Sequence, residues 1–113
     1  MLRRSFWRLF LGDNMKKADP FYKSQKWMKK RAAILKRDGY LCVLSKRYGK
    51  TVQADTVHHI YPRERYPEYA FSDWNLISLS TKMHNTLHNR DDKTLTAEGE
   101  KLRTATIPPT PQK

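Results

Sequence analysis

The sequence predicts a small α+β domain in which a leading helix packs on a β-hairpin and a second helix. Three observations lead to this prediction. The chain has 113 residues, a length that suits one small domain. Apolar residues recur at helical spacing within residues 24–37. Short β-prone segments then alternate with loops before a second helical pattern at residues 81–89.

The leading helix has clear start and stop signals. Ser24 is suited to cap the first turn, and the pair Asp38-Gly39 is typical of a helix end. We therefore expect a helix that runs to about Arg37. The buried stripe of this helix is expected to consist of Trp27, Met28, Ala32, Ile34 and Leu35.

The rest of the chain predicts shorter elements. They are a strand at 40–44, a turn at Gly49, a strand at 52–60, a loop at 61–74, a strand at 75–79, a helix at 81–89 and a short helix at 96–103. We expect an extension and linker at residues 1–20, the folded domain at residues 21–104 and a disordered tail at residues 105–113. No segment has the ~20 apolar residues of a membrane span.

The excess positive charge is confined to the first half of the chain. The net charge is +12, and residues 1–50 contain 15 Lys and Arg against 3 Asp and Glu, whereas residues 51–113 contain 8 of each kind. A one-sided basic surface favours a polyanionic partner, most simply nucleic acid. A solvated basic face or an anionic membrane surface would have the same composition. The single cysteine, Cys42, excludes an internal disulfide and suits a reducing cytoplasm.

All four histidines lie between positions 58 and 88. His84 and His88 are four residues apart on an expected helix, so they share one face and can bind one ion. His58 and His59 are neighbours on an expected strand, so their side chains point to opposite faces. At most one of these two can easily join the helical pair on a metal, and the other is left free for proton transfer.

Hydrolysis of a phosphodiester needs both kinds of group. A neutral imidazole can take the proton of the attacking water, and a divalent cation can stabilise the charge on the leaving oxygen. The base also needs an acceptor that fixes its tautomer, and the side-chain carbonyl of Asn75 is suited to that task. Taken alone, the pair His58-His59 is more typical of ordinary surface or core histidines, so the hypothesis depends on the combination.

The combination resembles a known family. The segments Val57-His58-His59-Ile60, Asn75-Leu76 and His84-Asn85-x-x-His88 resemble the motif of the HNH endonucleases, also called the ββα-metal or His-Me finger. The resemblance covers about residues 21–89, with the ββα core at about 52–90. It implies DNA hydrolysis that leaves 5′-phosphate and 3′-hydroxyl ends. It also implies that a metal ion is bound by His58, His84 and His88, with His59 as the general base and Asn75 orienting that base.

One divalent ion is expected at this site. Three imidazoles are compatible with Zn²⁺, Ni²⁺, Co²⁺ or Mn²⁺, and with Mg²⁺ where open positions remain. Many phage proteins of this family carry two Cys-x-x-Cys pairs for a structural zinc, but the matching positions here read Cys42-x-x-Ser45 and Ser80-x-x-Met83. We therefore expect no structural zinc. The fold is expected to rely instead on packing by Trp27, Tyr40, Leu44, Leu76, Leu79 and Met83.

Five basic residues are candidates for contact with nucleic acid, namely Lys26, Lys30, Arg31, Arg63 and Arg65. The lysines lie on the polar face of the leading helix, where they would follow the phosphate backbone. Arg31 lies inside the apolar stripe, so either its stem packs while its head reaches water, or its guanidinium binds a phosphate or a structural carboxylate. Arg63 and Arg65 follow the expected base, and at least one of them is expected to be simply solvated.

Two other functions fit the same residues. The first is a non-catalytic nucleic-acid-binding module that keeps the metal for structure. The second is an accessory protein of phage DNA packaging that contacts a terminase or portal. Replacing His59 by Ala separates the first from an enzyme, because binding would survive while cleavage is lost.

Overall fold

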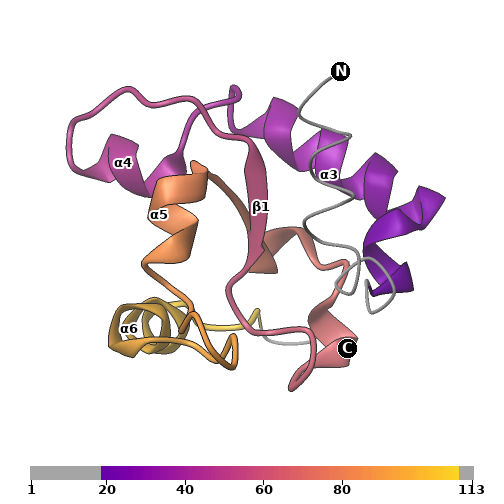
Figure 1. The fold of residues 1–113 in the computed structure, drawn as a ribbon. Helices are drawn as coiled ribbons and strands as arrows, with labels where there is room; N and C mark the ends of the chain where they lie inside the picture. Colours follow the sequence, from indigo (N-terminus) through magenta and orange to yellow (C-terminus); the bar gives the residue numbers. More distant parts are fainter. Residues whose placement is uncertain (1–18, 110–113) are drawn as a thin grey trace, which may run out of the picture.

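The computed structural model describes residues 19–109, which form a two-stranded antiparallel sheet with helices packed around it (Figure 1). This confirms the predicted α+β class. The elements in chain order are η1 (Pro20–Lys23), α3 (Gln25–Arg37), α4 (Val43–Arg47), β1 (Thr56–His59), η2 (Pro67–Tyr69), η3 (Asp73–Asn75), β2 (Leu76–Leu79), α5 (Thr81–Asn85) and α6 (Ala97–Ala105). None of the helices at residues 19–109 has the length and apolar character needed to cross a membrane. Most of the predicted N-terminal extension and the end of the predicted tail lie outside the described residues.

The predicted leading helix is confirmed as α3, together with both of its ends. The side chain of Ser24 accepts a hydrogen bond from the backbone N–H of Trp27 at 3.1 Å. This contact satisfies one of the free donors of the first turn. The helix ends at Asp38, and Gly39 then adopts a φ of 66°, which a glycine reaches without steric cost.

The buried stripe of α3 is narrower than the sequence predicted. Trp27, Ile34 and Leu35 are buried, whereas Met28 is 53 % exposed and Ala32 is also exposed. The reason is the small size of the sheet, because its two four-residue strands cover only one line of side chains along the helix. Positions i, i+7 and i+8 lie on that line, and the flanking apolar positions do not.

The predicted strand at residues 40–44 is wrong, because the chain forms helix α4 from Val43. Gly39 and Tyr40 have successive positive φ angles of 66° and 61°, so the chain turns sharply after α3. Only Leu41 then pairs as a strand would, in an isolated bridge with Gln53. The same turn leaves Tyr40 54 % exposed, so its predicted packing role is also wrong.

The two strands are shorter than the predicted segments 52–60 and 75–79. They pair antiparallel, with His59 opposite Leu76. Helix α3 packs on both strands, α4 packs on β2 and α5 packs on β1. In Figure 1, β1 crosses the centre of the molecule with α3 on one side and α4 and α5 on the other. The two faces of β1 therefore meet different surroundings.

Buried side chains form two clusters, one on each face of the sheet. The cluster under α3 contains Trp27, Ile34, Leu35, Val57 and Leu76. The cluster under α4 and α5 contains Cys42, Ile60, Tyr61, Ile77, Leu79 and Leu87, with Leu44 and Met83 packed against it. The predicted packing roles of Trp27, Leu76 and Leu79 are confirmed. Within the second cluster, the hydroxyl of Ser45 donates a hydrogen bond to the sulfur of Cys42 at 3.1 Å.

Helix α5 is shorter than the predicted helix at 81–89. The side chain of Ser80 caps its first turn, as expected. The helix ends at Asn85, and His88 lies beyond it in an isolated bridge with Leu95. The expectation that the last two histidines share one helical face is therefore wrong, and another element has to place His88.

Helix α6 confirms the predicted short helix at 96–103 and packs against the segment after α5. The backbone of Gly99 lies so close to the carbonyl oxygen of Leu87 that no side chain fits between them. The hydroxyl of Tyr61 donates a hydrogen bond to the carbonyl of Thr106 at 2.7 Å. The chain thus stays packed past residue 104, where the sequence suggested that the domain ends.

Candidate active site

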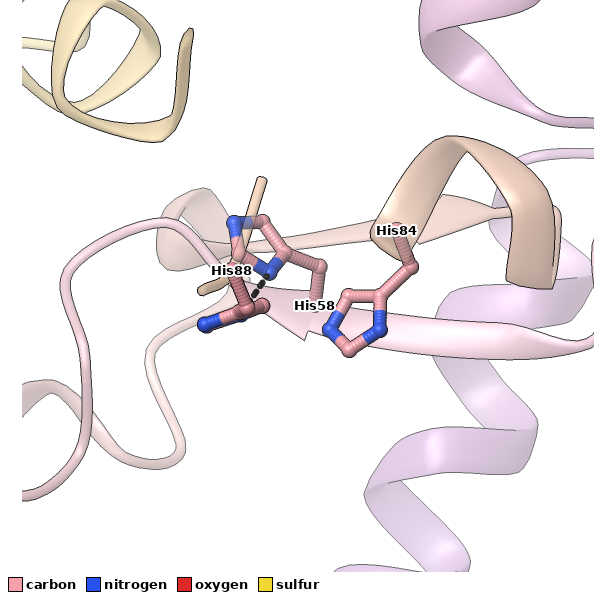
Figure 2. Close-up of side chains that lie close together, drawn as sticks. All are labelled: His58, His84 and His88. Atoms are coloured by element: carbon pink, nitrogen blue, oxygen red, sulfur yellow. Dashed lines mark hydrogen bonds between the residues drawn. The ribbon is translucent and has the colours of Figure 1, made fainter. Parts of the chain in front are cut away.

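Three of the four histidines meet in one cluster. His58 comes from β1, His84 from α5 and His88 from the segment after α5, and one ring nitrogen of each lies within 4.8 Å of the others (Figure 2). Nδ1 of His58 and Nε2 of His88 are 3.3 Å apart. The structure thus brings together the three side chains that the family resemblance assigns to a metal ion.

The surroundings of this cluster favour uncharged imidazole rings. Burial, followed by the charges of neighbouring histidines, holds the pKa of His58 well below its ordinary value. Burial and His88 lower the pKa of His84 to about 4, although Asp55 opposes the shift. Two nitrogens bound tetrahedrally to one ion at ~2.1 Å lie about 3.4 Å apart. The 3.3 Å between His58 and His88 is close to that value, so the donor set fits a divalent ion.

A backbone carbonyl orients His88. Nδ1 of its ring lies 3.1 Å from the carbonyl oxygen of Lys93. Because a carbonyl oxygen can only accept, Nδ1 donates this hydrogen bond and carries the proton. The lone pair is then on Nε2, the atom that faces His58. An acceptor on the outer nitrogen is typical of metal-binding histidines.

His59 lies on the opposite face of β1, as the alternation of a strand predicts. Its ring stacks on Trp27 of α3, with centroids 5.1 Å apart and planes inclined by 23°, and Phe21 lies against it at 5.9 Å. Its Nε2 donates a hydrogen bond to the carbonyl of Ala70 at 3.0 Å, which leaves Nδ1 as an acceptor. Burial lowers the pKa of His59, and the bond to Ala70 and the charge of Glu64 oppose this only in part. A neutral ring with one free nitrogen is suited to take a proton at neutral pH.

Asn75 holds the loop beside His59 rather than the ring itself. Its side-chain carbonyl accepts a hydrogen bond from the N–H of Tyr61 at 2.6 Å, and its amide donates to the carbonyls of Tyr61 and Tyr69 at 3.2 and 3.1 Å. The expectation that this carbonyl orients His59 directly is therefore wrong. The reason is that the N–H of Tyr61 already occupies the carbonyl of Asn75, and the backbone carbonyl of Ala70, just after η2 in the same loop, accepts from His59 instead.

The basic residues of α3 that the sequence suggested for nucleic-acid contact are largely engaged within the molecule. Nζ of Lys30 lies 2.6 Å from the carboxylate of Asp73. The guanidinium of Arg31 donates to the backbone carbonyl of Asp55 at 2.8 Å, a partner that neither of its two expected roles named. Lys26 lies 4.2 Å above a phenylalanine ring and forms no ion pair among the described residues.

The two arginines of the loop after β1 are also held in place. Arg63 forms an ion pair with Asp19, and its guanidinium lies 4.3 Å above the ring of Phe21. Arg65 forms an ion pair with Glu100 at 3.1 Å. Arg63 thus packs on the aromatic group around His59, whereas Arg65 connects the loop to α6. This group consists of Phe21, Tyr22 and Trp27, which contact the His59 ring, and of Phe71, which packs on Phe21 and carries Lys26.

Three contacts of the site were not expected from the sequence, namely the stacking of Trp27 and the carbonyls of Ala70 and Lys93. The position of Trp27 in the apolar stripe signals burial, but it does not indicate what the ring packs against. Every residue carries a backbone carbonyl, so no signal in the sequence distinguishes Ala70 or Lys93 from its neighbours.

Comparison with known proteins gives one informative similarity. The chain is similar to the HNH endonuclease of the deep-sea thermophilic bacteriophage GVE2, whose crystal structure was solved with a manganese ion. The sequence identity is 31 % and the TM-score is 0.58, and the match covers 69 % of this chain and 85 % of that chain. No family model and no curated protein matches the chain. The likeness therefore concerns both sequence and fold, over most of the length of both chains.

Proposed function

This chain belongs to the HNH endonuclease family, and we propose that it is a metal-dependent enzyme that hydrolyses DNA phosphodiester bonds. The observation that carries the proposal is the division of roles along β1. His58 faces His84 and His88, while its neighbour His59 faces the other way with one ring nitrogen free. The manganese ion in the similar phage enzyme supports a divalent ion at the histidine cluster.

In the proposed reaction, Nδ1 of His59 accepts the proton of the water that attacks the phosphorus atom. The carbonyl of Ala70 keeps the other ring proton on Nε2, so that Nδ1 stays available. His58, His84 and His88 would hold a divalent ion, which would supply positive charge to stabilise the leaving oxygen. The bond between phosphorus and the 3′ oxygen breaks, and the 3′ oxygen takes a proton from solvent water. This leaves the 5′-phosphate and 3′-hydroxyl ends that the family resemblance implies.

The basic residues around His59 contact the DNA backbone in this proposal. Lys26 and Arg63 lie on aromatic rings of the group around His59, but Arg63 is already paired with Asp19, so Lys26 is best placed to hold a phosphate near the base. Four of the five residues, Lys30, Arg31, Arg63 and Arg65, already bind acidic or carbonyl partners within the fold. They would reach DNA only by exchanging these partners.

Nicking of supercoiled plasmid by metal-free protein, with Mg²⁺, Mn²⁺, Ni²⁺ or Zn²⁺ added singly, tests the proposal. We expect metal-dependent nicking that EDTA stops, and a loss of at least about 100-fold in His59→Ala. Val57→Ala is the matched control, because Val57 is a buried neighbour on the same face of β1 without a titratable group. It should nick at close to the wild-type rate, and His59→Ala should still shift DNA in a gel.

Two results would overturn the proposal. One is wild-type protein that nicks with none of the four ions. The other is His59→Ala that nicks as fast as Val57→Ala. Retained DNA binding without cleavage in the wild type would instead favour a non-catalytic binding module.

A further inference from the structure

His88 lies beyond the end of α5, so the contacts that hold its ring in place must come from another segment. Helix α5 ends at Asn85, three residues before His88, so the helical repeat that places His84 does not place His88. The contacts that hold the His88 ring and backbone come from farther along the chain. They are the hydrogen bond from Nδ1 to the carbonyl of Lys93 at 3.1 Å and the bridge to Leu95.

We propose that the turn formed by residues 89–95 is a positioning device for the metal centre, with Asn89 and Lys93 as its positioning residues. This inference rests on the proposed function, since it concerns the ion that the three histidines would bind. It goes further in assigning a role to a segment that contributes no ligand. The role is to fix the tautomer and the direction of the His88 ring.

Hydrogen bonds within the turn give it a defined shape. The N–H of Asn89 donates to the carbonyl of Thr94 at 2.6 Å, and the N–H of Lys93 donates to the carbonyl of Asn89 at 2.9 Å. The side-chain amide of Asn89 donates to the hydroxyl of Thr94 at 2.9 Å and to the carbonyl of Leu95 at 3.3 Å. Asp92 accepts from both the N–H and the hydroxyl of Thr94. Asn89 thus bonds to the far side of the turn through both backbone and side chain.

Lys93 adopts a conformation that its side chain does not favour. Its φ is 63°, in the left-handed region where a side chain is crowded by the backbone. Such a conformation persists only where the surrounding contacts require it. Here the contacts across the turn require it, and the outcome is a Lys93 carbonyl that accepts from Nδ1 of His88. The side chain of Lys93 is exposed, so the backbone carries the role.

The consequence for the metal centre is direct. With the proton held on Nδ1, the lone pair on Nε2 faces Nδ1 of His58 at 3.3 Å. Loss of the Lys93 carbonyl would let the ring rotate or change tautomer, and the ligand atom would leave the cluster. Loss of such an outer partner typically lowers metal affinity by about 10–100-fold.

Two substitutions at position 93 separate the role of the backbone conformation from the role of the side chain. Lys93→Gly and Lys93→Val both remove the positive charge, but glycine adopts a positive φ freely and a β-branched valine does not. We expect Lys93→Gly to bind Mn²⁺ within about twofold of wild type and Lys93→Val to bind at least about tenfold more weakly, as measured by isothermal titration calorimetry. Asn89→Ala should also lose about tenfold, whereas Asn85→Ala, an exposed amide on α5, is the matched control and should lose nothing.

A second readout separates positioning from a general loss of stability. In ¹⁵N-detected spectra of the metal-free protein, the His88 ring should carry its proton on Nδ1 in wild type and Lys93→Gly, and should show mixed tautomers in Lys93→Val. Equal Mn²⁺ affinity in Lys93→Val, Lys93→Gly and wild type would overturn the inference. Wild-type protein that does not bind Mn²⁺, or His84→Ala that binds it as well as wild type, would instead overturn the proposed metal centre itself.

Discussion

The two faces of β1 carry the same residue type in adjacent positions, yet their surroundings differ in almost every respect. On one face, His58 meets two further imidazoles that come from α5 and from the segment after it. On the other face, His59 meets the aromatic rings of Trp27 and Phe21 from α3 and η1. The chemistry of a histidine on this strand is therefore decided by the element that packs against its face.

The two faces also share one kind of contact, which leaves a different ring nitrogen free on each face. A backbone carbonyl accepts a hydrogen bond from a histidine on each side, from Nε2 of His59 at Ala70 and from Nδ1 of His88 at Lys93. The nitrogen left free is therefore Nδ1 of His59, on the side of the proposed base, and Nε2 of His88, on the side of the proposed metal site. In the proposed function, the same kind of contact thus leaves one ring free to accept a proton and the other free to bind an ion.

The largest effects are expected when the two adjacent histidines are replaced separately. His58→Ala should abolish the stabilisation that Mn²⁺ confers, which is about 2.7 kcal/mol at 100 times the dissociation constant. His59→Ala should keep that stabilisation and lose nicking by about 10²–10⁴-fold. Thermal unfolding with and without Mn²⁺, beside the plasmid assay, measures both. An equal loss of metal-induced stabilisation in the two variants would refute the division of roles.

Replacing Trp27 should damage the base side alone. Trp27→Ala removes a ring that is 3 % exposed and should lower the free energy of unfolding by about 3–5 kcal/mol. Ile34→Ala is the matched control, with an expected loss of about 2–5 kcal/mol, because Ile34 is also buried but lies about two helical turns along α3 from Trp27. Urea unfolding gives the stabilities, and nicking is then compared per folded molecule.

The two variants should differ in rate rather than in stability. Trp27→Ala should nick more slowly per folded molecule because the His59 ring has lost its stacking surface, and Trp27→Phe should recover most of that rate. If Trp27→Ala and Ile34→Ala nick equally fast per folded molecule, the stacking serves only the core.

A smaller effect is expected from Asn75, which acts on the base side through its loop. Asn75→Ala leaves the buried N–H of Tyr61 without its acceptor, which should lower the free energy of unfolding by about 1–3 kcal/mol. Nicking should fall because the carbonyl of Ala70 shifts relative to His59, whereas calorimetry should find an unchanged Mn²⁺ affinity. A weakened Mn²⁺ affinity would mean that the loop supports both faces.

The smallest effect is expected from Asp38, which attaches the end of α3 to the sheet and makes the free energy of unfolding depend on pH. Burial alone would raise the pKa of Asp38, but hydrogen bonds from Arg37 and from Ser78 of β2 outweigh it, so the pKa lies below its ordinary value. Because the folded-state pKa is the lower one, the contacts stabilise the fold above about pH 4, and this contribution is lost as the pH falls through the folded-state pKa.

Asp38→Asn should therefore cost about 1 kcal/mol at neutral pH, and the difference from wild type should shrink below about pH 4. Urea unfolding between pH 2 and pH 7 measures this. The Mn²⁺ affinity at neutral pH should not change, since Asp38 contacts the side of the sheet that α3 covers. A difference from wild type that stays constant down to pH 2 would contradict the assigned cause.

The parts of the fold that the sequence predicted depend on neighbours along the chain. The cap at Ser24 and the end at Asp38 are local signals, and the structure confirms them. Strand alternation is local as well, and it placed His58 and His59 on opposite faces. The predictions that were wrong, the strand at 40–44 and the helix through His88, concern short segments whose state depends on long-range packing.

The sequence by itself thus determined which side chains are available for the proposed site and that two of them point apart. Only the tertiary structure decided which groups meet them. The stacking of Trp27 on His59 and the carbonyls of Ala70 and Lys93 join positions that are far apart in the chain or depend on one unusual backbone angle. The physical reason is that side-chain type and periodicity are local properties that can be read directly from the sequence. A hydrogen bond to a carbonyl, in contrast, depends on the path of the whole backbone, which every residue type can follow.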